Sequence, residues 1–188
     1  MLDPIFDKDR PVYVIGGGAS LKDFDWQRLA GEQVMAVNLA FFKLPHATAL
    51  FFGDDAFYDR WRDLHYPAGD FRRFKGEHIF TTAPGLADIA HPRIRYVAPD
   101  ALTLKKGKKS FSAEQCNSGI KAAVLARLLG AQTVVHLGFD ASQGHWADGE
   151  PYRHPVGTYD ANTFARFNAD TAALLAFPGF SDDPAYLT

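Results

Sequence analysis

The sequence is poor in cysteine and in long hydrophobic runs. Cys116 is the single cysteine among 188 residues, so an internal disulfide framework is excluded and a reducing compartment is favoured. No stretch approaches the roughly 20 apolar residues of a membrane-spanning helix. Residues 1–10 contain three aspartates and no apolar run, unlike a secretory signal peptide. We therefore expect a cytoplasmic protein with no transmembrane segment.

The sequence also lacks a strong excess of charge of either sign. The net charge is −2, with 20 Lys and Arg against 22 Asp and Glu, so no global field recruits nucleic acid or an anionic membrane. The apolar content of 47% is ordinary for a globular protein, and the length suits one domain over residues 1–188 with a core at about 12–175. The lysine-rich segment 105–109 is expected to be an exposed loop, which could bind a polyanion such as a phosphorylated glycan or DNA.

Short apolar runs alternate with segments of helical periodicity along the chain. Such continuously apolar strands are typical of a parallel sheet buried on both faces. The expected strands are 12–15, 34–37, 49–52, 78–81, 94–97 and 133–137. The expected helices are 23–29, 56–64, 118–129 and 162–175, and a turn-rich tail follows residue 178. The predicted fold class is therefore α/β and Rossmann-like, with a mostly parallel sheet and helices on both of its faces.

A glycine turn, Gly16-Gly17-Gly18, follows the first of these strands and leads to Ser20. Glycine permits a positive φ and a close approach of the backbone to a ligand, and free amides at such a turn bind anions. The spacing is not that of the dinucleotide fingerprint, because Leu21 stands where its third glycine is required. The turn is therefore either a phosphate-binding loop or a simple connection between a strand and a helix.

Polar residues end several of the other expected strands. In parallel sheets the ligand binds beyond the carboxyl ends of the strands, so we expect these residues to meet at one edge. They are Asn38, Asp54, Asp55 and Asp140. Asp54 and Asp55 could hold Mg²⁺ on a diphosphate or could cap the helix that follows them. Asn38 could contact a ligand or cap a turn, and Ser118 and Gly119 could bind an anion where their helix begins.

Two histidines occur in the polar loop that follows Asp140. Histidine is the side chain whose ordinary pKa lies near neutrality, which suits a general base that removes a proton from an acceptor hydroxyl, and His145 and His154 are the candidates. Asp140 is the third catalytic candidate because of its place at the sheet edge. Each of these side chains could instead be an ordinary solvated residue of a surface loop.

Three blocks between about residues 12 and 175 resemble a superfamily of Rossmann-like transferases. The segment 14–21 is similar to its Gly-Asn-Gly-Pro-Ser-Leu opening, Asn38 to the Asn that ends its second strand, and 117–140 to its best-marked block. The superfamily contains bacterial lipooligosaccharide sialyltransferases, motility-accessory flagellin glycosyltransferases and archaeal 6-hydroxymethylpterin diphosphokinases. Gly17 and Ala19 stand where this opening has Asn and Pro, and Gly53-Asp54 where the sialyltransferases have Asn-Pro.

The resemblance implies a site for a nucleotide-activated donor. In the sialyltransferases the turn and the strand-end Asn hold a cytidine nucleotide, and the Ser-Gly helix start faces the donor sugar. The corresponding residues here are Gly16, Gly17, Gly18, Ser20, Asn38, Ser118 and Gly119. A His in the loop after the last of these blocks is the general base in that family, which implies His154. An Asp after the third strand, as at Asp54, is closer to the flagellin-transferase and diphosphokinase branches.

Three functions follow as hypotheses. The first is a glycosyltransferase that uses a nucleotide-sugar donor, with a CMP-linked sugar among the candidates, and a glycan or other hydroxyl acceptor, without a required metal. The second is a Mg²⁺-dependent diphosphokinase acting on a small hydroxymethyl compound, with Asp54, Asp55 and Asp140 on the metal. The third is a non-catalytic nucleotide-binding or interaction module. The sequence leaves the acceptor open, and also the choice between a monomer and a homo-oligomer.

Overall fold

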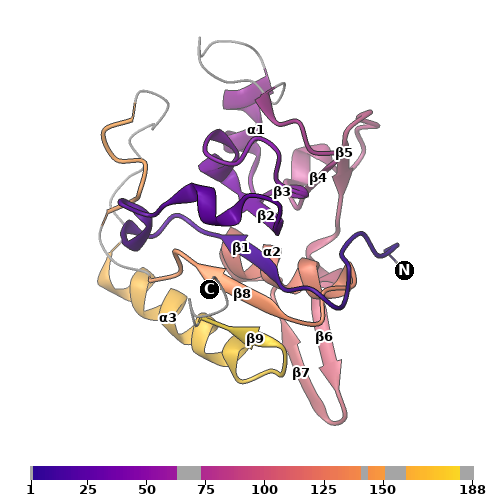
Figure 1. The fold of residues 1–188 in the computed structure, drawn as a ribbon. Coiled ribbons are helices and arrows are strands. Elements are labelled where there is room, and N and C mark those ends of the chain that lie inside the picture. Colours follow the sequence, from indigo (N-terminus) through magenta and orange to yellow (C-terminus); the bar gives the residue numbers. More distant parts are fainter. Residues whose placement is uncertain (1, 63–72, 141–143, 151–159, 183–188) are drawn as a thin grey trace.

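The computed structural model describes residues 2–62, 73–140, 144–150 and 160–182. Its centre is a sheet of seven strands in the order β5-β4-β3-β2-β1-β8-β9, and every neighbouring pair is parallel (Figure 1). The strands are β1 (Val12–Ile15), β2 (Gln33–Val37), β3 (Ala49–Phe52), β4 (His78–Thr81), β5 (Ile94–Tyr96), β8 (Val134–Leu137) and β9 (Phe180–Ser181). The predicted α/β, Rossmann-like fold class is confirmed.

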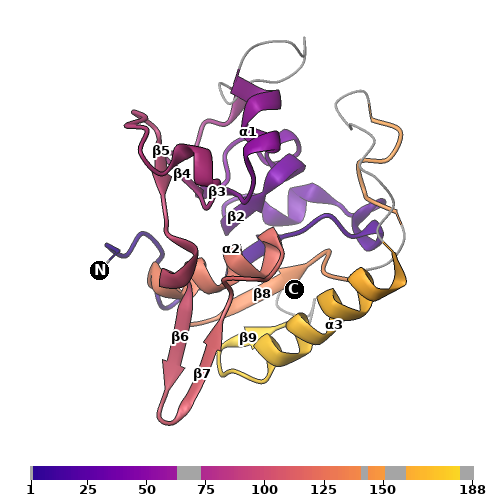
Figure 2. The ribbon, with the colours of Figure 1, turned by 180° about the vertical axis from the view of Figure 1, so that it is seen from behind.

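The helices cover both faces of the sheet. One face carries α2 (Ser118–Leu128), which packs across β1, β2, β3 and β8, and α3 (Ala161–Leu175), which lies beside β9 (Figure 2). The other face is covered by α1 (Asp55–Arg62) and by short 3₁₀ helices. Those 3₁₀ helices are η1 (Ala19–Leu21), η2 (Trp26–Leu29) and η3 (Asn38–Phe42), while η5 (Pro84–Leu86) and η6 (Pro99–Ala101) follow β4 and β5.

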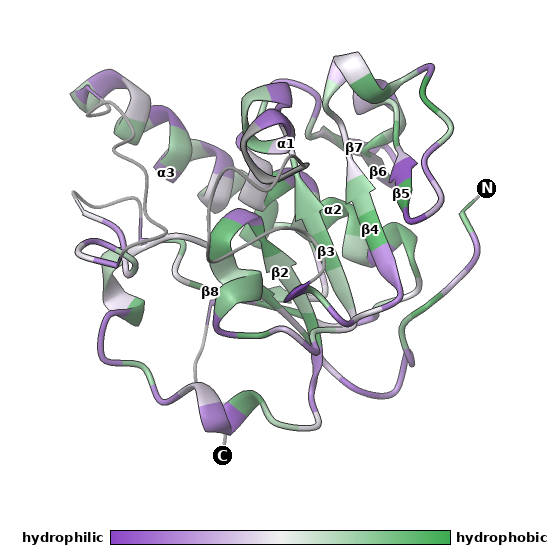
Figure 3. Cartoon of the chain, turned by 90° about the horizontal axis from the view of Figure 1, so that it is seen from above, coloured by the Kyte–Doolittle hydropathy of each residue, from purple (hydrophilic) through white to green (hydrophobic). Residues whose placement is uncertain are grey.

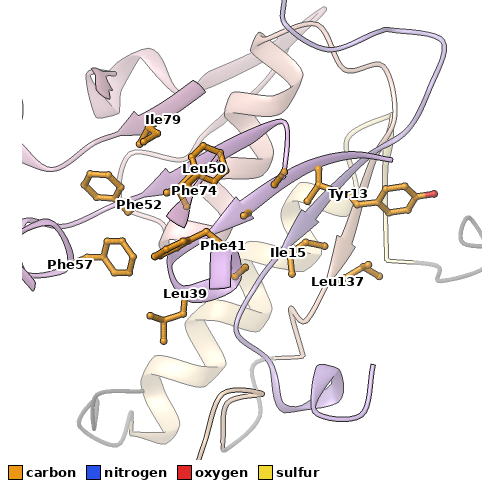
Figure 4. Packing of buried hydrophobic residues seen from close by; sticks show 14 of the residues in the cluster. Tyr13, Ile15, Leu39, Phe41, Leu50, Phe52, Phe57, Phe74, Ile79 and Leu137 are labelled. Carbon is orange, nitrogen blue, oxygen red and sulfur yellow. The ribbon is translucent and has the colours of Figure 1, made fainter. Parts of the chain in front are cut away.

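Hydrophobic side chains fill the space on either side of the sheet. Figure 3 shows apolar strands in the middle of the molecule and more polar residues on the outer parts of α1 and α3. On the face of the 3₁₀ helices, aromatic and aliphatic side chains such as Phe41, Leu50 and Phe52 interlock without exposure to solvent (Figure 4). The alanine-rich side of α2 lies close against the opposite face, where small side chains allow helix and sheet to approach. Both faces of the central strands are therefore buried, as their sequences predict.

Three expected segments differ from the structure. Residues 105–109 are not a loop but part of a hairpin, in which β6 (Thr103–Lys106) pairs with β7 (Lys109–Ser112) around Gly107 at φ +59°. The expected helix over 23–29 shortens to η2, because the Asp25 side chain accepts a hydrogen bond from the Gln27 amide and caps it there. The expected irregular tail contributes β9, which pairs with β8 at the edge of the sheet. Among the described residues, no helix combines the length and the apolar character needed to cross a bilayer.

Candidate functional site

The order of the strands reverses direction between β1 and β8. From β1 the chain adds β2 to β5 on one side, and it later returns to place β8 and β9 on the other side. Open α/β sheets bind ligands at such a reversal, outside the carboxyl ends of the strands. Here that position is formed by residues 16–20 after β1, residues 138–140 after β8 and Asn38 after β2. The expected meeting of the glycine turn, Asn38 and Asp140 at one edge agrees with the topology.

The glycine turn packs tightly against the loop after β8. The amides of Gly16 and Gly18 donate to the carbonyls of Leu137 and Gly138, both at 2.8 Å. A Cβ on Gly16 would lie 2.5 Å from the Gly138 oxygen, and one on Gly18 would collide with the Asp140 carboxylate. Gly18 has φ −61°, and none of these three glycines has a positive φ. The turn does not use the positive φ that glycine permits, and what requires glycine here is the close approach of neighbouring protein atoms.

The segment 144–150 closes over the same turn from the other side. The Trp146 indole donates to the Gly16 carbonyl at 3.0 Å, and the Trp146 amide donates to the Gly17 carbonyl at 3.3 Å. His145 Nδ1 accepts from the Ala147 amide at 3.0 Å, and its Nε2 lies 2.6 Å from the position of a Cβ on Gly17. The imidazole thus fills the space that a side chain at position 17 would take. Of the two predicted histidines, His145 lies at the turn, whereas His154 lies outside the described residues.

Ser20 and Asp140 join the two sides of the reversal directly. The Ser20 hydroxyl donates to Asp140 Oδ1 at 2.5 Å, although 120 residues separate them in the chain. Both residues are exposed, so this pair forms the rim of the site. The amides of Gly17, Ala19 and Ser20 make no hydrogen bond with another described residue. These three amides, rather than those of Gly16 and Gly18, are the donors that the turn can offer to an anion.

Asn38 is the most unusual residue at this edge. Its φ of 51° makes it the one described non-glycine residue in the left-handed region. Its Oδ1 is buried and has no hydrogen-bond partner among the residues that the structure describes. A left-handed backbone and an unpartnered buried acceptor each cost free energy, and such features concentrate where a ligand uses them. Because Ile15 pairs with Ala36 across β1 and β2, Asn38 leaves the sheet next to the glycine turn.

The two aspartates after β3 have local structural roles. Asp54 Oδ1 accepts from the Phe57 amide at 2.7 Å and thereby caps the start of α1. Asp55 Oδ1 accepts from the Gly85 amide at 2.9 Å and ties α1 to η5. Among the described residues there is no group of three or more His, Cys, Asp or Glu side chains able to hold a metal ion. A magnesium role for Asp54 and Asp55 stays a prediction, and the structure accounts for both carboxylates without it.

The start of α2 reaches the same edge of the sheet. Asn117 caps the helix by accepting from the Ile120 amide at 3.0 Å, so Ser118 is the first helical residue rather than the cap. The Ser118 hydroxyl lies against Gly53 after β3, and a Cβ on Gly119 would lie 2.8 Å from the Phe139 ring. Ser118 and Gly119 therefore lie at the rim, beyond the ends of β3 and β8. Burial raises the pKa of the Cys116 thiol to about 11, so this nearby residue stays protonated and is unsuited to nucleophilic chemistry.

Sequence reasoning missed the role of Trp146 and the backbone strain at Asn38. For Trp146 the one available signal was a tryptophan inside an otherwise polar loop. Such a large aromatic side chain is usually buried, as Trp146 is here, and it then needs a packing partner. Trp146 is 5% exposed and its ring lies 5.3 Å from that of Trp26. The contact with Gly16 spans 130 residues of sequence, and no local pattern predicts it.

Comparison with known proteins gives a likeness in fold. No protein-family model matches the sequence, and no curated protein matches it at a significant level. A solved structure of the sialyltransferase CstII from Campylobacter jejuni, in complex with the substrate analogue cytidine-5'-monophosphate, is similar to this chain with a TM-score of 0.50 and 17% identity. The match covers 93% of this chain and 86% of that one. A variant of the alpha-2,3/8-sialyltransferase CstII matches with a TM-score of 0.47 and 18% identity, over 88% of this chain and 75% of the other. The chain therefore has a sialyltransferase-like α/β fold.

Proposed function

We propose that this chain is a transferase that binds a nucleotide-activated sugar at the reversal between β1 and β8 and transfers the sugar to a hydroxyl acceptor. The observation that carries the proposal is Asn38 beside the glycine turn, with its left-handed backbone and a buried Oδ1 that no other described residue contacts by a hydrogen bond. An unpartnered acceptor calls for a donor on the ligand. The ribose hydroxyls and the exocyclic amine of a nucleoside are donors of that kind.

The neighbouring groups suit the rest of such a ligand. The amides of Gly17, Ala19 and Ser20 could receive the phosphate, since they make no hydrogen bond to another described residue. The sialyltransferase of similar fold is described in complex with cytidine-5'-monophosphate, which supports a cytidine nucleotide among the candidates. A donor held by amides and a carboxamide does not require a metal ion.

In the proposed reaction the acceptor hydroxyl oxygen attacks the anomeric carbon of the donor sugar. A bond forms between that oxygen and the carbon, and the bond from the carbon to the nucleotide phosphate breaks, so the nucleotide leaves with the electron pair. The hydroxyl proton passes to a general base. His154 is the base implied by the family resemblance, and His145 is the histidine beside the turn. The acceptor is a glycan or another small hydroxyl compound.

Replacement of Asn38 by glycine tests the proposal sharply. Glycine adopts φ 51° without strain and removes the buried Oδ1, so Asn38→Gly should fold at least as stably as the wild type. If Asn38 binds the nucleoside, the same variant should bind nucleotide at least tenfold more weakly, because a hydrogen bond to the ligand is lost. Isothermal titration with CMP, UMP, GMP and AMP, with and without Mg²⁺, measures both the preference and the loss. Equal nucleotide affinity in the wild type and Asn38→Gly, or no binding of any nucleotide to the wild type, would refute the assignment.

A further inference from the structure

The β6–β7 hairpin is a cationic element that the proposed site does not use. Lys105, Lys106, Lys108 and Lys109 occur within five residues and are all exposed. None of these side chains makes a hydrogen bond or an ion pair with another residue that the structure describes. In Figures 1 and 2 the hairpin projects from the body of the molecule, on the side away from the segment 144–150. Its charge is therefore available to a partner and separate from the reversal between β1 and β8.

The base of the hairpin is firmly held. Leu104 and Phe111 are opposite each other in the ladder, and both pack against the hydrophobic cluster under α2. The Phe111 ring lies 6.0 Å from that of Phe177, just after α3. Gly107, at φ +59°, supplies the left-handed conformation that the two-residue turn requires. The lysines are thus presented on a built element and not on an irregular loop.

The positions of the lysines weaken the hairpin. Lys106 and Lys109 are directly opposite in the antiparallel ladder. Like charges at opposed positions repel and destabilise the pair of strands. No described acidic side chain forms an ion pair that would offset this repulsion. The four charges therefore do not serve the stability of the fold, and this points to an anionic partner.

The shape and the residue types favour one class of partner. Proteins that bind single-stranded nucleic acid use a positive groove together with exposed aromatic side chains on which the bases stack. Residues 105–110 contain no aromatic residue, and Phe111 is half-buried against Phe177. A projecting hairpin with lysines in and around its turn is instead suited to a broad and diffuse negative surface. Clusters of lysine bind anionic lipid headgroups in this way, each adding about fivefold to the affinity.

We propose that the β6–β7 hairpin is a docking element for an anionic phospholipid surface. The lysines bind the headgroups at the interface, and the absence of apolar residues between 105 and 110 means that the turn rests on the surface without entering the hydrocarbon. In Figures 1 and 2 the hairpin lies on the other side of the molecule from the carboxyl ends of β1 and β8, so docking through the hairpin leaves the proposed nucleotide site uncovered. This proposal does not depend on the identity of the reaction.

Vesicle co-sedimentation of the full chain tests the docking. We expect binding to vesicles of phosphatidylcholine mixed with phosphatidylglycerol, no binding to phosphatidylcholine alone, and a steep loss of binding as salt is added. The double variant K106Q/K109Q should bind at least tenfold more weakly, since two lysines are neutralised. The matched control K8Q/K22Q changes the net charge equally at exposed positions outside the hairpin, and it should bind as the wild type does.

A stability measurement separates docking from a structural role. Because K106Q/K109Q removes the repulsion between opposed lysines, its thermal midpoint should equal or exceed that of the wild type. The proposal is overturned if the wild type does not sediment with anionic vesicles, or if both double variants lose binding equally. It is also overturned if the wild type binds a single-stranded oligonucleotide but no vesicles, and K106Q/K109Q binds that oligonucleotide more weakly than the wild type does. The partner is then nucleic acid.

Discussion

We predict that His136 makes the stability of this protein depend strongly on pH. The side chain lies in β8, is 3% exposed, and stacks on the Phe139 ring at a centroid distance of 4.5 Å. Within the described part of the chain, neither ring nitrogen has a hydrogen-bond partner. Burial lowers the pKa of His136 to about 4, against a smaller opposing effect of the Asp182 carboxylate. The folded protein therefore holds this imidazole neutral over a range in which the unfolded chain binds a proton.

The sign and the size of the effect follow from that difference in pKa. Above the ordinary histidine pKa of 6.5, neither state binds the proton and His136 contributes no pH dependence. As the pH falls below 6.5 the unfolded chain gains the proton first, so the free energy of unfolding decreases until the folded pKa near 4 is reached. The total loss from this residue is about 3 kcal/mol, of which about 2 kcal/mol is lost by pH 5.

Replacement of His136 by leucine isolates this contribution. Leucine is of similar size and does not titrate, so the free energy of unfolding of His136→Leu should fall less steeply between pH 7.5 and 5 than that of the wild type. Urea unfolding at several pH values gives both curves, and their difference cancels the other titrating groups. His46→Leu, at an exposed histidine, is the matched control and should follow the wild type. Parallel curves for His136→Leu and the wild type would refute the assignment of a buried neutral imidazole.

Two further predictions concern the glycine turn. Gly16→Ala should destabilise the fold by about 1–3 kcal/mol, because its Cβ would meet the Gly138 carbonyl, whereas Gly17→Ala should cost less, since it meets only the His145 side chain. Urea unfolding gives the free energy of unfolding of both variants. An equal decrease in the two would contradict the distinction between a contact with the backbone and a contact with a side chain. Trp146→Phe should cost about 1–3 kcal/mol, because the buried Gly16 carbonyl loses its donor, while Trp26→Phe in the same aromatic group should cost less. If the two tryptophan variants unfold at the same urea concentration, the hydrogen bond to Gly16 is not what stabilises the segment 144–150.

The sheet could be predicted closely from the sequence, because its strands are buried on both faces. Runs such as 12–15 and 49–52 are continuously apolar, and the structure buries every residue in both. The hairpin was harder, since lysine is a poor strand former and the run 105–109 has the composition of a solvated loop. What makes it a hairpin is the contact of Leu104 and Phe111 with the core, which depends on residues distant in the sequence.

The candidate site could be predicted in outline only. The rule that ligands bind at the carboxyl ends of parallel strands selects Asn38 and Asp140 from the sequence alone. It does not give the hydrogen bond from Ser20 to Asp140, nor the left-handed backbone of Asn38, because both depend on how separate segments meet. The sequence correctly predicts that Asp54 follows the end of a strand. It does not predict that the Asp54 carboxylate accepts a hydrogen bond from the Phe57 amide.

Two of the three glycines after β1 are required for packing within the protein and not, as their sequence suggests, for binding a ligand. Gly16 and Gly18 let β8 and its loop approach the turn, and both of their amides are already bonded to that side. Of the three glycine amides, only that of Gly17 makes no hydrogen bond to another described residue, and it joins the amides of Ala19 and Ser20 as a donor of the turn. At position 17 the His145 imidazole fills the space that a side chain would take. The proposed nucleotide contact at this edge therefore rests chiefly on Asn38, whose buried Oδ1 has no hydrogen-bond partner among the described residues.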